Sequence, residues 1–264
     1  MRAAGYRNLF DSDRARAGDR LEGVFVVEGA RTIRHLLDAG WPLQSVLLSA
    51  GRAAARADLV GDALAGGAAV YTTGQDVFDH IVGYHVHRGA LALAVRPAPA
   101  PVEGVARSAE LLLVVEGVSD HENVGSLFRN AAAFGVGAVV VDPATADPLY
   151  RRAVRVSLGA VLRVPFARSD RWPADLDHLR SMGFRLVALS PGGDVDVAEL
   201  AVGRGERLAL LVGSEGDGLS AAALARADVT VRIPMAAGAD SVNVATAAAI
   251  ALHRVARLAG PGEP

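Results

Sequence analysis

Residues 111–142 have the sequence LLLVVEGVSDHENVGSLFRNAAAFGVGAVVVD, and this stretch decides the fold. Residues 111–117 and 137–142 are short apolar runs that predict buried strands, while residues 123–135 between them predict a helix. Strands joined through a crossover helix run parallel, and a parallel sheet needs helices over both of its faces. The stretch therefore predicts an α/β domain built around a parallel sheet.

The same alternation continues towards the C-terminus. A helical segment near 149–157 comes next, followed by a helix that begins near Pro173 and ends at Gly183. Three further apolar runs then predict strands, and an alanine-rich run predicts the last helix. The strands are expected at 184–190, 207–213 and 228–234, and the helix at 241–260.

A second, smaller α/β unit precedes this domain. Its strands are expected at 24–29, 45–50, 68–72 and 90–95, and its helices at 30–40, 58–67 and 76–82. The alternating Ala-Pro of RPAPAPVEGVA (96–106) suits neither a helix nor a central strand, so it predicts a semi-rigid linker. We therefore expect an N-terminal domain over 1–96 that starts with a loose polar arm, a linker over 97–107 and a C-terminal domain over 108–264.

Composition narrows the class of protein. Hydrophobic residues make up 51% of the 264 residues, which is enough for a folded core. The formal net charge of −2 argues against nucleic-acid binding by bulk electrostatics alone, but it allows local patches of arginine. The absence of cysteine excludes disulfides and thiolate metal sites. There is neither a membrane-spanning apolar run nor a signal-peptide core, so we expect a cytoplasmic protein.

Unusual residues follow three of the predicted strands, at the carboxyl edge where parallel sheets bind ligands. After the strand at 111–117, Asn123 is placed to cap the next helix, and Arg129 follows six residues later. Free N–H groups at the start of a helix, with an arginine nearby, suit an anion. A capped helix with a surface arginine is the plainer interpretation of the same residues.

Two later loops complete the set. The glycines of GSEGDGLS (213–220) either let the backbone approach a ligand closely or form a simple tight turn. Their G-x-x-G-x-G spacing differs from the dinucleotide pattern G-x-G-x-x-G, which argues against a nicotinamide enzyme or a Rossmann-type methyltransferase. After the strand at 228–234, Ser241 and Asn243 open the alanine-rich helix, which suits a buried core or a dimer interface.

Together, in this order, the three segments resemble the motifs of the SpoU (TrmH-like) branch of the SPOUT RNA methyltransferases. Departures from the family pattern are mild: Val242 stands where leucine is usual, and the loop 236–240 differs. The N-terminal unit resembles the L30e-like substrate-binding domain of the same family through VVEGARTIRHLLDAG (26–40). The three motifs are NVGSLFR (123–129), LVGSEGDGL (211–219) and IPM (233–235) followed by SVNVA (241–245).

The resemblance implies a cofactor and an assembly. Members bind S-adenosylmethionine in a deep C-terminal trefoil knot, need no metal and work as homodimers through the C-terminal domain. By motif position, Gly213, Ile233 and Val242 should contact the cofactor, largely through backbone atoms. Met235 and Ser190 are further expected contacts.

The resemblance also implies a catalytic role for Arg129. Transfer needs an in-line approach of a ribose oxygen to the sulfonium methyl group, so positioning and charge stabilisation matter most. The family gives this arginine an activating role, even as a base. Because a guanidinium group keeps its proton, we assign Arg129 to holding a phosphate and stabilising the developing alkoxide. Hydrogen bonds from Asn123, Glu215, Ser241 and Asn243 would orient these parts.

Two further clusters support weaker hypotheses. Arg151 and Arg155 either contact RNA phosphates or form a solvated helix face, and Arg155 is the better RNA candidate. His80, His85 and His87 lie close together in sequence without a carboxylate or cysteine to complete a ligand set. A solvated or RNA-facing loop is therefore favoured over a metal site.

The function implied by the resemblance is methylation of a ribose 2′-hydroxyl of RNA. Ribosomal RNA is favoured as the substrate, because ribosomal members of the family often carry the extra N-terminal domain. Transfer RNA would need the same chemistry and stays open. A non-catalytic RNA-binding protein is a different class, which the intact Asn123, Arg129, Glu215 and Asn243 disfavour. A small-molecule methyltransferase is disfavoured by the extra domain.

Overall fold

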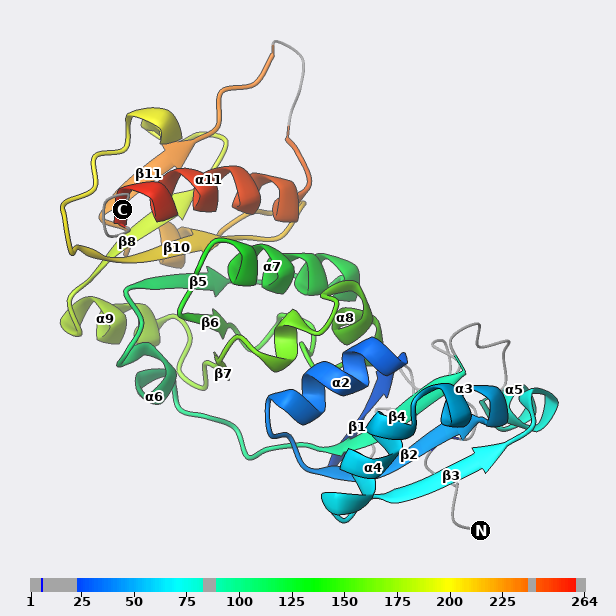
Figure 1. Cartoon of the computed structure of the whole chain (residues 1–264). Coiled ribbons are helices and arrows are strands. Elements are labelled where there is room, and N and C mark those ends of the chain that lie inside the picture. The colour runs from blue at the N-terminus through cyan, green and yellow to red at the C-terminus, as the bar shows by residue number, and fades with distance from the viewer. Residues whose placement is uncertain (1–5, 7–22, 83–88, 237–240, 260–264) are drawn as a thin grey trace. The chain divides into compact units, whose positions relative to one another are not determined.

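The computed structural model describes residue 6 and residues 23–82, 89–236 and 241–259 (Figure 1). The chain forms two compact units. Unit 1 contains Met1–Ala98 with Leu149–Leu162, and unit 2 contains Pro99–Pro148 with Arg163–Pro264. Outside the described residues lie the expected polar arm apart from Tyr6, the histidines His85 and His87, and most of the loop 236–240.

Unit 2 is built on a seven-stranded sheet in which all neighbouring strands run parallel. The strand order is β7-β6-β5-β10-β8-β11-β9. This confirms the parallel sheet that the continuous apolar runs predict. The strands are β5 (Leu111–Val115), β6 (Ala138–Val141), β7 (Phe166–Arg168), β8 (Phe184–Leu189), β9 (Val195–Asp196), β10 (Arg207–Val212) and β11 (Val229–Arg232).

Helices cover both faces of this sheet (Figure 1). On one face α7 and α11 pack against each other, and the Asn130 side chain of α7 donates to the carbonyl of Ala245 in α11 at 2.7 Å. On the other face α6, α9 and α10 pack over a core that contains Leu112 and Val114. These helices are α6 (Val102–Ala106), α7 (His121–Ala133), α9 (Ala174–Ser181), α10 (Ala221–Leu224) and α11 (Val244–Ala259).

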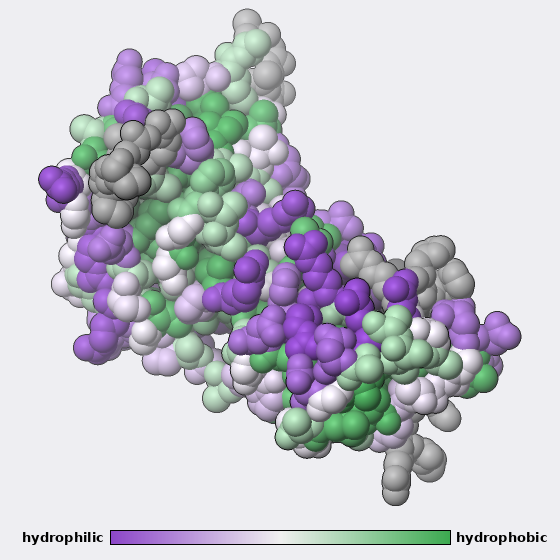
Figure 2. Space-filling view, viewed as in Figure 1, coloured by the Kyte–Doolittle hydropathy of each residue, from purple (hydrophilic) through white to green (hydrophobic). Residues whose placement is uncertain are grey.

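The outer side of α11 leaves an apolar side chain at the surface. Thr246, Ile250 and His253 are all exposed, and the spacing of four and three residues puts them on one stripe of the helix. Ile250 itself is 42% exposed, and Figure 2 shows hydrophobic surface over this helix. None of the described helices has the length and apolar character that crossing a bilayer requires.

The start of α7 differs from the sequence prediction. Asn123 is the predicted cap, but Asp120 holds that place: one of its carboxylate oxygens accepts from the backbone N–H groups of Glu122 at 2.6 Å and Asn123 at 3.0 Å. The prediction is wrong because Asp and Asn both cap helices well, and the helix begins earlier, at His121. Asn123 therefore lies in the first turn, where its side chain serves other contacts.

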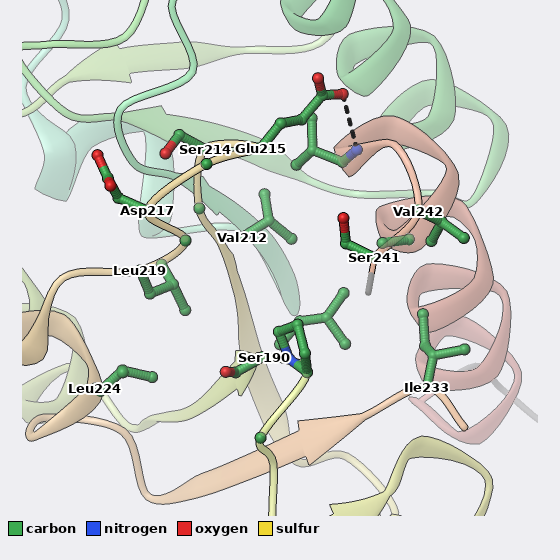
Figure 3. Close-up of a pocket in the computed structure, with 18 of the residues that line it drawn as sticks. Ser190, Val212, Ser214, Glu215, Asp217, Leu219, Leu224, Ile233, Ser241 and Val242 are labelled. Carbon is green, nitrogen blue, oxygen red and sulfur yellow. Dashed lines mark hydrogen bonds between the residues drawn. The ribbon is translucent and has the colours of Figure 1, made fainter. Parts of the chain in front are cut away.

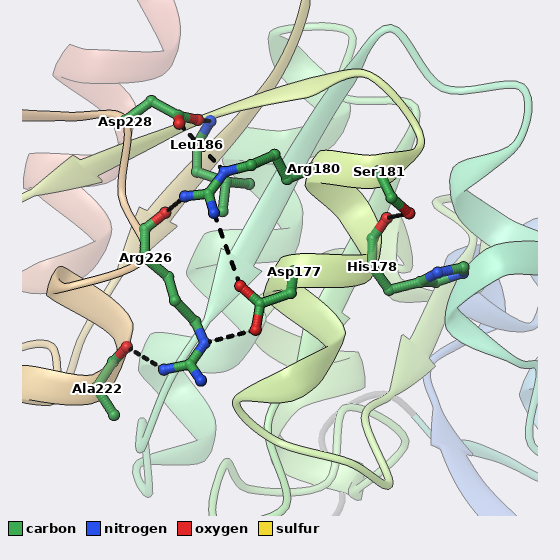
Figure 4. Close-up of polar contacts among 8 residues, drawn as sticks. All are labelled: Asp177, His178, Arg180, Ser181, Leu186, Ala222, Arg226 and Asp228. Atoms are coloured by element: carbon green, nitrogen blue, oxygen red, sulfur yellow. Dashed lines mark hydrogen bonds and ion pairs between the residues drawn. The ribbon is translucent and has the colours of Figure 1, made fainter.

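Ion pairs join α9 and the end of α10 to the start of β11 (Figure 4). Nε of Arg226 donates to Asp177 at 2.9 Å, and Nε of Arg180 donates to Asp228 at 3.2 Å. A second nitrogen of Arg180 donates to the carbonyl of Arg226. Asp228 also accepts from the N–H of Leu186 at 2.7 Å. Each surface pair contributes little alone, but together they hold both helices against the sheet.

Unit 1 has a four-stranded mixed sheet in the order β1-β4-β2-β3. β4 runs antiparallel to β1 and β2, whereas β3 runs parallel to β2. Tyr6 is fully buried against this sheet, where its hydroxyl hydrogen-bonds Ser45 at 2.9 Å and burial raises its pKa. The elements are β1 (Val24–Glu28), β2 (Leu43–Ser49), β3 (Ala69–Thr73), β4 (Ala90–Val95), α2 (Ala30–Asp38), α3 (Ala50–Ala55), α4 (Ala57–Ala65), α5 (Gln75–Val82) and α8 (Arg151–Val156).

The last helix of unit 1, α8, comes from the middle of the chain. Its Arg151 forms an ion pair with Glu28 at 3.2 Å, and these side chains are only 11% and 9% exposed. Farther along the same segment, the carbonyl of Leu162 accepts from Nε1 of Trp41 at 2.8 Å. This segment lies well beyond the boundary expected near residue 97, so unit 1 is discontinuous in sequence.

The segment expected as a linker, 97–107, is partly helical. Residues 97–101 form neither helix nor strand, as the Ala-Pro alternation predicts. The alternation ends at Pro101, and α6 begins at the next residue. Val102 and Ala106 of this helix are buried in the core of unit 2, which makes the helix part of that unit.

Candidate active site

A cavity of about 410 Å³ lies in unit 2 at the carboxyl ends of the neighbouring strands β8, β10 and β11 (Figure 3). This is the edge of a parallel sheet at which ligands bind. The first turn of α11 closes one side of the cavity. The lining consists of Leu189–Gly192, Val212–Leu219, Leu224, Ile233, Met235, Ser241, Val242, Val244 and Ala247.

All five residues predicted to contact a cofactor line this cavity. Ser190 follows β8, Gly213 follows β10 and Ile233 follows β11, so the parallel sheet brings three distant segments to one edge. Met235 and Val242 lie farther along the chain towards α11 and also line the cavity. Figure 3 shows Ser190 and Ile233 with Ser241 and Val242 around the same space.

Sequence reasoning missed the wall that follows β8, of which it named only Ser190. Its other lining residues are Pro191 and Gly192, and Leu189 at the end of β8 also lines the cavity. The sequence carries a signal for them, because a proline and two glycines directly follow a buried strand there, and such residues mark a loop. The other lining residues, to which no cofactor contact was individually assigned, are Val212, Ser214, Gly216, Asp217, Gly218, Leu219, Leu224, Val244 and Ala247.

The loop after β10 needs glycine for its own shape. A Cβ on Gly213 would lie 2.2 Å from the carbonyl carbon of Gly218 and 2.3 Å from the nitrogen of Leu219, so no side chain fits. Gly218 has a φ of +69°, which favours glycine. Ser214 and Gly218 also form a short antiparallel bridge. A tight turn therefore explains these two glycines, and the turn forms one wall of the cavity.

Glu215 connects this loop to α7 and α11. Its Oε1 accepts from Nδ2 of Asn123 at 3.1 Å and from Nδ2 of Asn243 at 2.5 Å. It also accepts from the N–H of Val244 at 3.3 Å, which is the bond drawn from Glu215 in Figure 3. Nδ2 of Asn243 also donates to Oδ1 of Asn123 at 2.8 Å. One predicted residue from each of the three sequence motifs therefore joins a single hydrogen-bonded cluster at the cavity.

Asn243 also caps α11, as the sequence predicts. Its Oδ1 accepts from the N–H groups of Ala245 at 2.9 Å and Thr246 at 3.2 Å. Its amide nitrogen donates to Glu215 and Asn123. The two ends of the amide have opposite hydrogen-bonding roles, so these partners define one orientation of the side chain.

The other two predicted catalytic residues are placed differently. Ser241 lines the cavity. Arg129 does not line it; it lies on α7, six residues beyond Asn123, and its side chain is exposed. Within the described part of the chain, the Arg129 guanidinium group has no hydrogen-bond or ion-pair partner. An exposed arginine without such a partner is available to an anionic group.

A buried carboxylate supports the far end of the loop after β10. Glu116, directly after β5, is 7% exposed and accepts from Nε1 of Trp172 at 2.7 Å. It also accepts from the N–H of Ser220 at 2.8 Å and from the Ser220 hydroxyl at 2.7 Å. These three donors compensate for burying the carboxylate. Sequence reasoning missed Glu116, whose signal is an acidic residue at the end of an apolar strand.

The arginines predicted to contact RNA lie on α8 in unit 1. Arg151 is engaged with Glu28, as described above. Arg155 is half-buried, and among the described residues its guanidinium group has no partner. No group of three potential metal ligands occurs in the described ranges, which include His80 but not His85 or His87.

Comparison with known families gives this site its context. Residues 110–253, more than half of the chain, match the SpoU rRNA methylase family. The chain belongs to this family. In the SpoU protein, residues 26–100 also match a family described as RNA 2′-O ribose methyltransferase substrate binding. Both matches confirm the resemblance that the three motifs and the N-terminal unit indicate.

Relatives of this SpoU protein extend over nearly its whole length. An uncharacterized tRNA/rRNA methyltransferase of Mycobacterium tuberculosis is 44% identical, over 97% of this chain and 90% of the relative. The SpoU methyltransferase AviRb from Streptomyces viridochromogenes, solved in complex with the cofactor AdoMet, is 25% identical with a TM-score of 0.80, over 97% of this chain and 96% of that chain. The SpoU protein is therefore an RNA methyltransferase.

A shorter structural neighbour covers only part of the SpoU protein. Its structure is described as giving insights into the 2-OH methylation of C/U34 on tRNA. That chain is 30% identical to this one, with a TM-score of 0.50. The alignment covers 95% of that chain but 56% of this one. Nearly the whole of that neighbour therefore corresponds to little more than half of the SpoU protein.

Proposed function

We propose that this SpoU enzyme transfers the methyl group of S-adenosylmethionine to the 2′-oxygen of a ribose in ribosomal RNA. The observation that carries the proposal is the cluster of Asn123, Glu215 and Asn243. Through Glu215, the cluster joins a wall of the cavity to α7, the helix that carries Arg129. The loop after β10 would then hold the methyl donor, and α7 would hold an RNA phosphate at Arg129. The hydrogen bonds of Glu215 fix these two elements to each other.

The methyl donor is S-adenosylmethionine, and the cavity suits it in size and charge. A volume of about 410 Å³ lies within the usual range for small-ligand sites. The lining provides the hydroxyls of Ser190, Ser214 and Ser241 and the carboxylates of Glu215 and Asp217, and none of the described residues that form it is basic. The donor carries a positive sulfonium group, which an acidic lining favours. When bound, the donor supplies an electrophilic methyl group.

We assign contact with the donor to the five predicted residues that line the cavity. Gly213 has no side chain, so its contribution comes from backbone atoms. Ile233, Met235 and Val242 provide apolar surface, and the hydroxyl of Ser190 provides a hydrogen-bonding group. The trefoil knot implied by the family resemblance stays a prediction.

Methyl transfer to a ribose requires an oriented hydroxyl and stabilisation of negative charge on its oxygen. We assign the stabilisation to Arg129, whose guanidinium group remains protonated and can hold a phosphate through two parallel hydrogen bonds. Asn123, Glu215 and Asn243 fix the position of α7 relative to the cavity wall. The Ser241 hydroxyl lies in the lining and would help to orient the ribose.

Ribosomal RNA is the proposed substrate because of unit 1. The neighbour concerned with tRNA methylation aligns with 56% of this chain, whereas a substrate-binding family match occupies residues 26–100. We propose that residues 1–96 bind RNA and residues 108–264 perform the transfer, with the segment 149–162 serving the RNA-binding unit. Arg155 would contact a phosphate, while Arg151 secures α8. Transfer RNA is the second candidate, supported by the shared catalytic region.

Mapping 2′-O-methyl groups in total RNA tests this proposal. Cells with and without the gene are compared nucleotide by nucleotide through the resistance of 2′-O-methylated positions to alkaline cleavage. We expect one ribosomal position to lose its methyl group and to regain it when the gene is restored. Loss at a transfer-RNA position would support the second candidate. No change at any position, with RNA binding intact, would indicate a non-catalytic RNA-binding protein.

We also propose that the enzyme is a homodimer formed through unit 2. The exposed stripe of Thr246, Ile250 and His253 on α11 supports this assembly. Burial of the Ile250 side chain against a second copy would remove apolar surface from water and so favour association.

Ile250→Arg is therefore expected to convert the dimer into a monomer, because the interface would have to bury an unpaired charge. Light scattering at micromolar concentration measures the molar mass. Leu64→Arg is the matched control, since Leu64 is a 56% exposed apolar residue on α4 of unit 1. A wild-type protein that is already monomeric would contradict the proposal.

A further inference from the structure

The loop that follows β8, residues 190–193, forms one wall of the cavity and packs directly against β11. The N–H of Ser190 donates to the carbonyl of Val231 at 2.9 Å. A Cβ on Gly193 would lie 2.3 Å from the carbonyl carbon of Val231, so the loop approaches that strand too closely for a side chain. The opposite side of the loop, through Pro191 and Gly192, faces the cavity. The position of this wall is therefore set by what holds the loop to β11.

Several bonds hold the end of this loop to β11, and one guanidinium group makes two of them. Nη1 of Arg232 donates to the carbonyl of Gly193 at 2.6 Å and to that of Asp194 at 2.9 Å. Two residues earlier in β11, the hydroxyl of Thr230 donates to the Asp194 carboxylate at 2.6 Å. Alternate residues of a strand share a face, so Thr230 and Arg232 act on the same side of the loop.

Arg232 also borders the second wall of the cavity. It is the last residue of β11, and the next residue, Ile233, lines the cavity, as does Met235. Arg232 itself is not part of the lining. Its side chain thus fixes the wall after β8, and its main chain leads directly into the wall after β11.

We propose that Arg232 is a positioning residue for the methyl donor: it sets the spacing between these two walls without touching the ligand. The inference rests on the proposed function, because it takes the cavity as the donor site. Without the guanidinium group, the carbonyls of Gly193 and Asp194 lose their side-chain donor and the wall loosens. The loop after β8 then has to become ordered when the donor binds, and this loss of conformational freedom weakens the affinity for the donor.

The test measures binding and turnover separately in full-length variants. Arg232→Gln is expected to raise the Kd for S-adenosylmethionine about tenfold in calorimetry, which corresponds to about 1.4 kcal/mol, the order of one hydrogen bond to a charged group. The KM for the donor should rise in parallel. The kcat at saturating donor and the KM for RNA should stay near wild type. Arg232→Lys keeps the charge but places a single ammonium group on a shorter side chain, so it should rescue only part of the affinity.

Arg185→Gln is the matched control. In β8, Nη1 of Arg185 also donates to a loop carbonyl, that of Ala201 at 2.9 Å, and pairs with Glu206 at 3.5 Å. None of these residues lines the cavity. This variant should have a similar melting temperature to Arg232→Gln but a wild-type Kd for the donor. An equal rise in Kd for both variants would show a general structural effect and overturn the positioning role.

Thr230→Val provides a second test if Arg232→Gln does not fold. It removes the bond that the Thr230 hydroxyl donates to the Asp194 carboxylate and the bond that it accepts from the Asp194 N–H at 3.2 Å. It should raise the donor Kd in the same direction, by a smaller factor. A wild-type Kd in Thr230→Val and in any folded Arg232 variant would overturn the inference while leaving the proposed function intact. A wild-type protein that does not bind S-adenosylmethionine would overturn the proposed function itself.

Discussion

Arg129→Ala is expected to lower methyl transfer at saturating RNA by about a hundredfold or more, the usual effect of removing a group that stabilises charge in the transition state. The fold should be unaffected, because the Arg129 side chain is exposed and has no partner among the described residues. The affinity for S-adenosylmethionine should also be unchanged, because Arg129 does not line the cavity. Single-turnover transfer to RNA, thermal melting and calorimetry separate these three properties.

Two further variants define what Arg129 contributes. Arg129→Lys keeps a positive charge but loses the planar fork, so little rescue would show that the fork holds a phosphate and the attacking oxygen together. Arg204→Ala removes another exposed arginine of unit 2, in the loop before β10 and so at the opposite edge of the sheet, and should transfer methyl groups normally. Turnover of Arg129→Ala within a few-fold of wild type would remove Arg129 from the active site.

Glu215→Ala is expected to lower transfer by a similar factor of about a hundred, through loss of geometry rather than of charge stabilisation. Asn123, Asn243 and the N–H of Val244 all lose their shared acceptor. Because these groups lie near the surface, water can replace the acceptor, and stability should fall only slightly. The donor Kd should rise as well, since Glu215 lines the cavity.

Glu215→Gln separates the shape of this side chain from its charge. Glutamine retains one oxygen that can accept from the two asparagines, so a largely active variant would show that the acceptor is what matters. Asp217→Ala is the comparison for the transfer step at saturating donor, because Asp217 lies in the same loop and lines the cavity but has no hydrogen-bond partner among the described residues. It should change the affinity for the donor but not the rate of transfer. Equal losses in Glu215→Ala and Asp217→Ala would contradict a specific role for the cluster.

The sheet of unit 2 could be predicted because two of its neighbouring strands, β5 and β6, are apolar throughout. Residues 111–115 and 138–141 are buried along their whole length, and such runs belong to sheets with both faces covered. The place of the cavity followed from the same reasoning, since Gly213 and Ile233 come directly after strands. Chemistry that depends on strand ends is therefore accessible from sequence once the strands are identified.

Contacts between distant segments were harder to predict for a physical reason. The bonds of Arg232 end on backbone carbonyls, and every residue has a carbonyl, so the sequence carries no signal for the partner. The cap of α7 was misplaced because Asp120 and Asn123 have the same capping chemistry. β9, with two residues, is too short to show a period. The periodicity of α8 indicates a helix but not which unit it completes.

The insertion of Leu149–Leu162 into unit 1 has a consequence for biosynthesis. The ribosome delivers the chain from the N-terminus, and domains generally fold as they emerge. When residue 98 leaves the ribosome, Glu28 still lacks Arg151, and Trp41 still lacks the carbonyl of Leu162. By the time these partners emerge, β5, α7 and β6 of unit 2 have already been made. The first unit to begin synthesis therefore cannot complete its fold before much of the second has been translated.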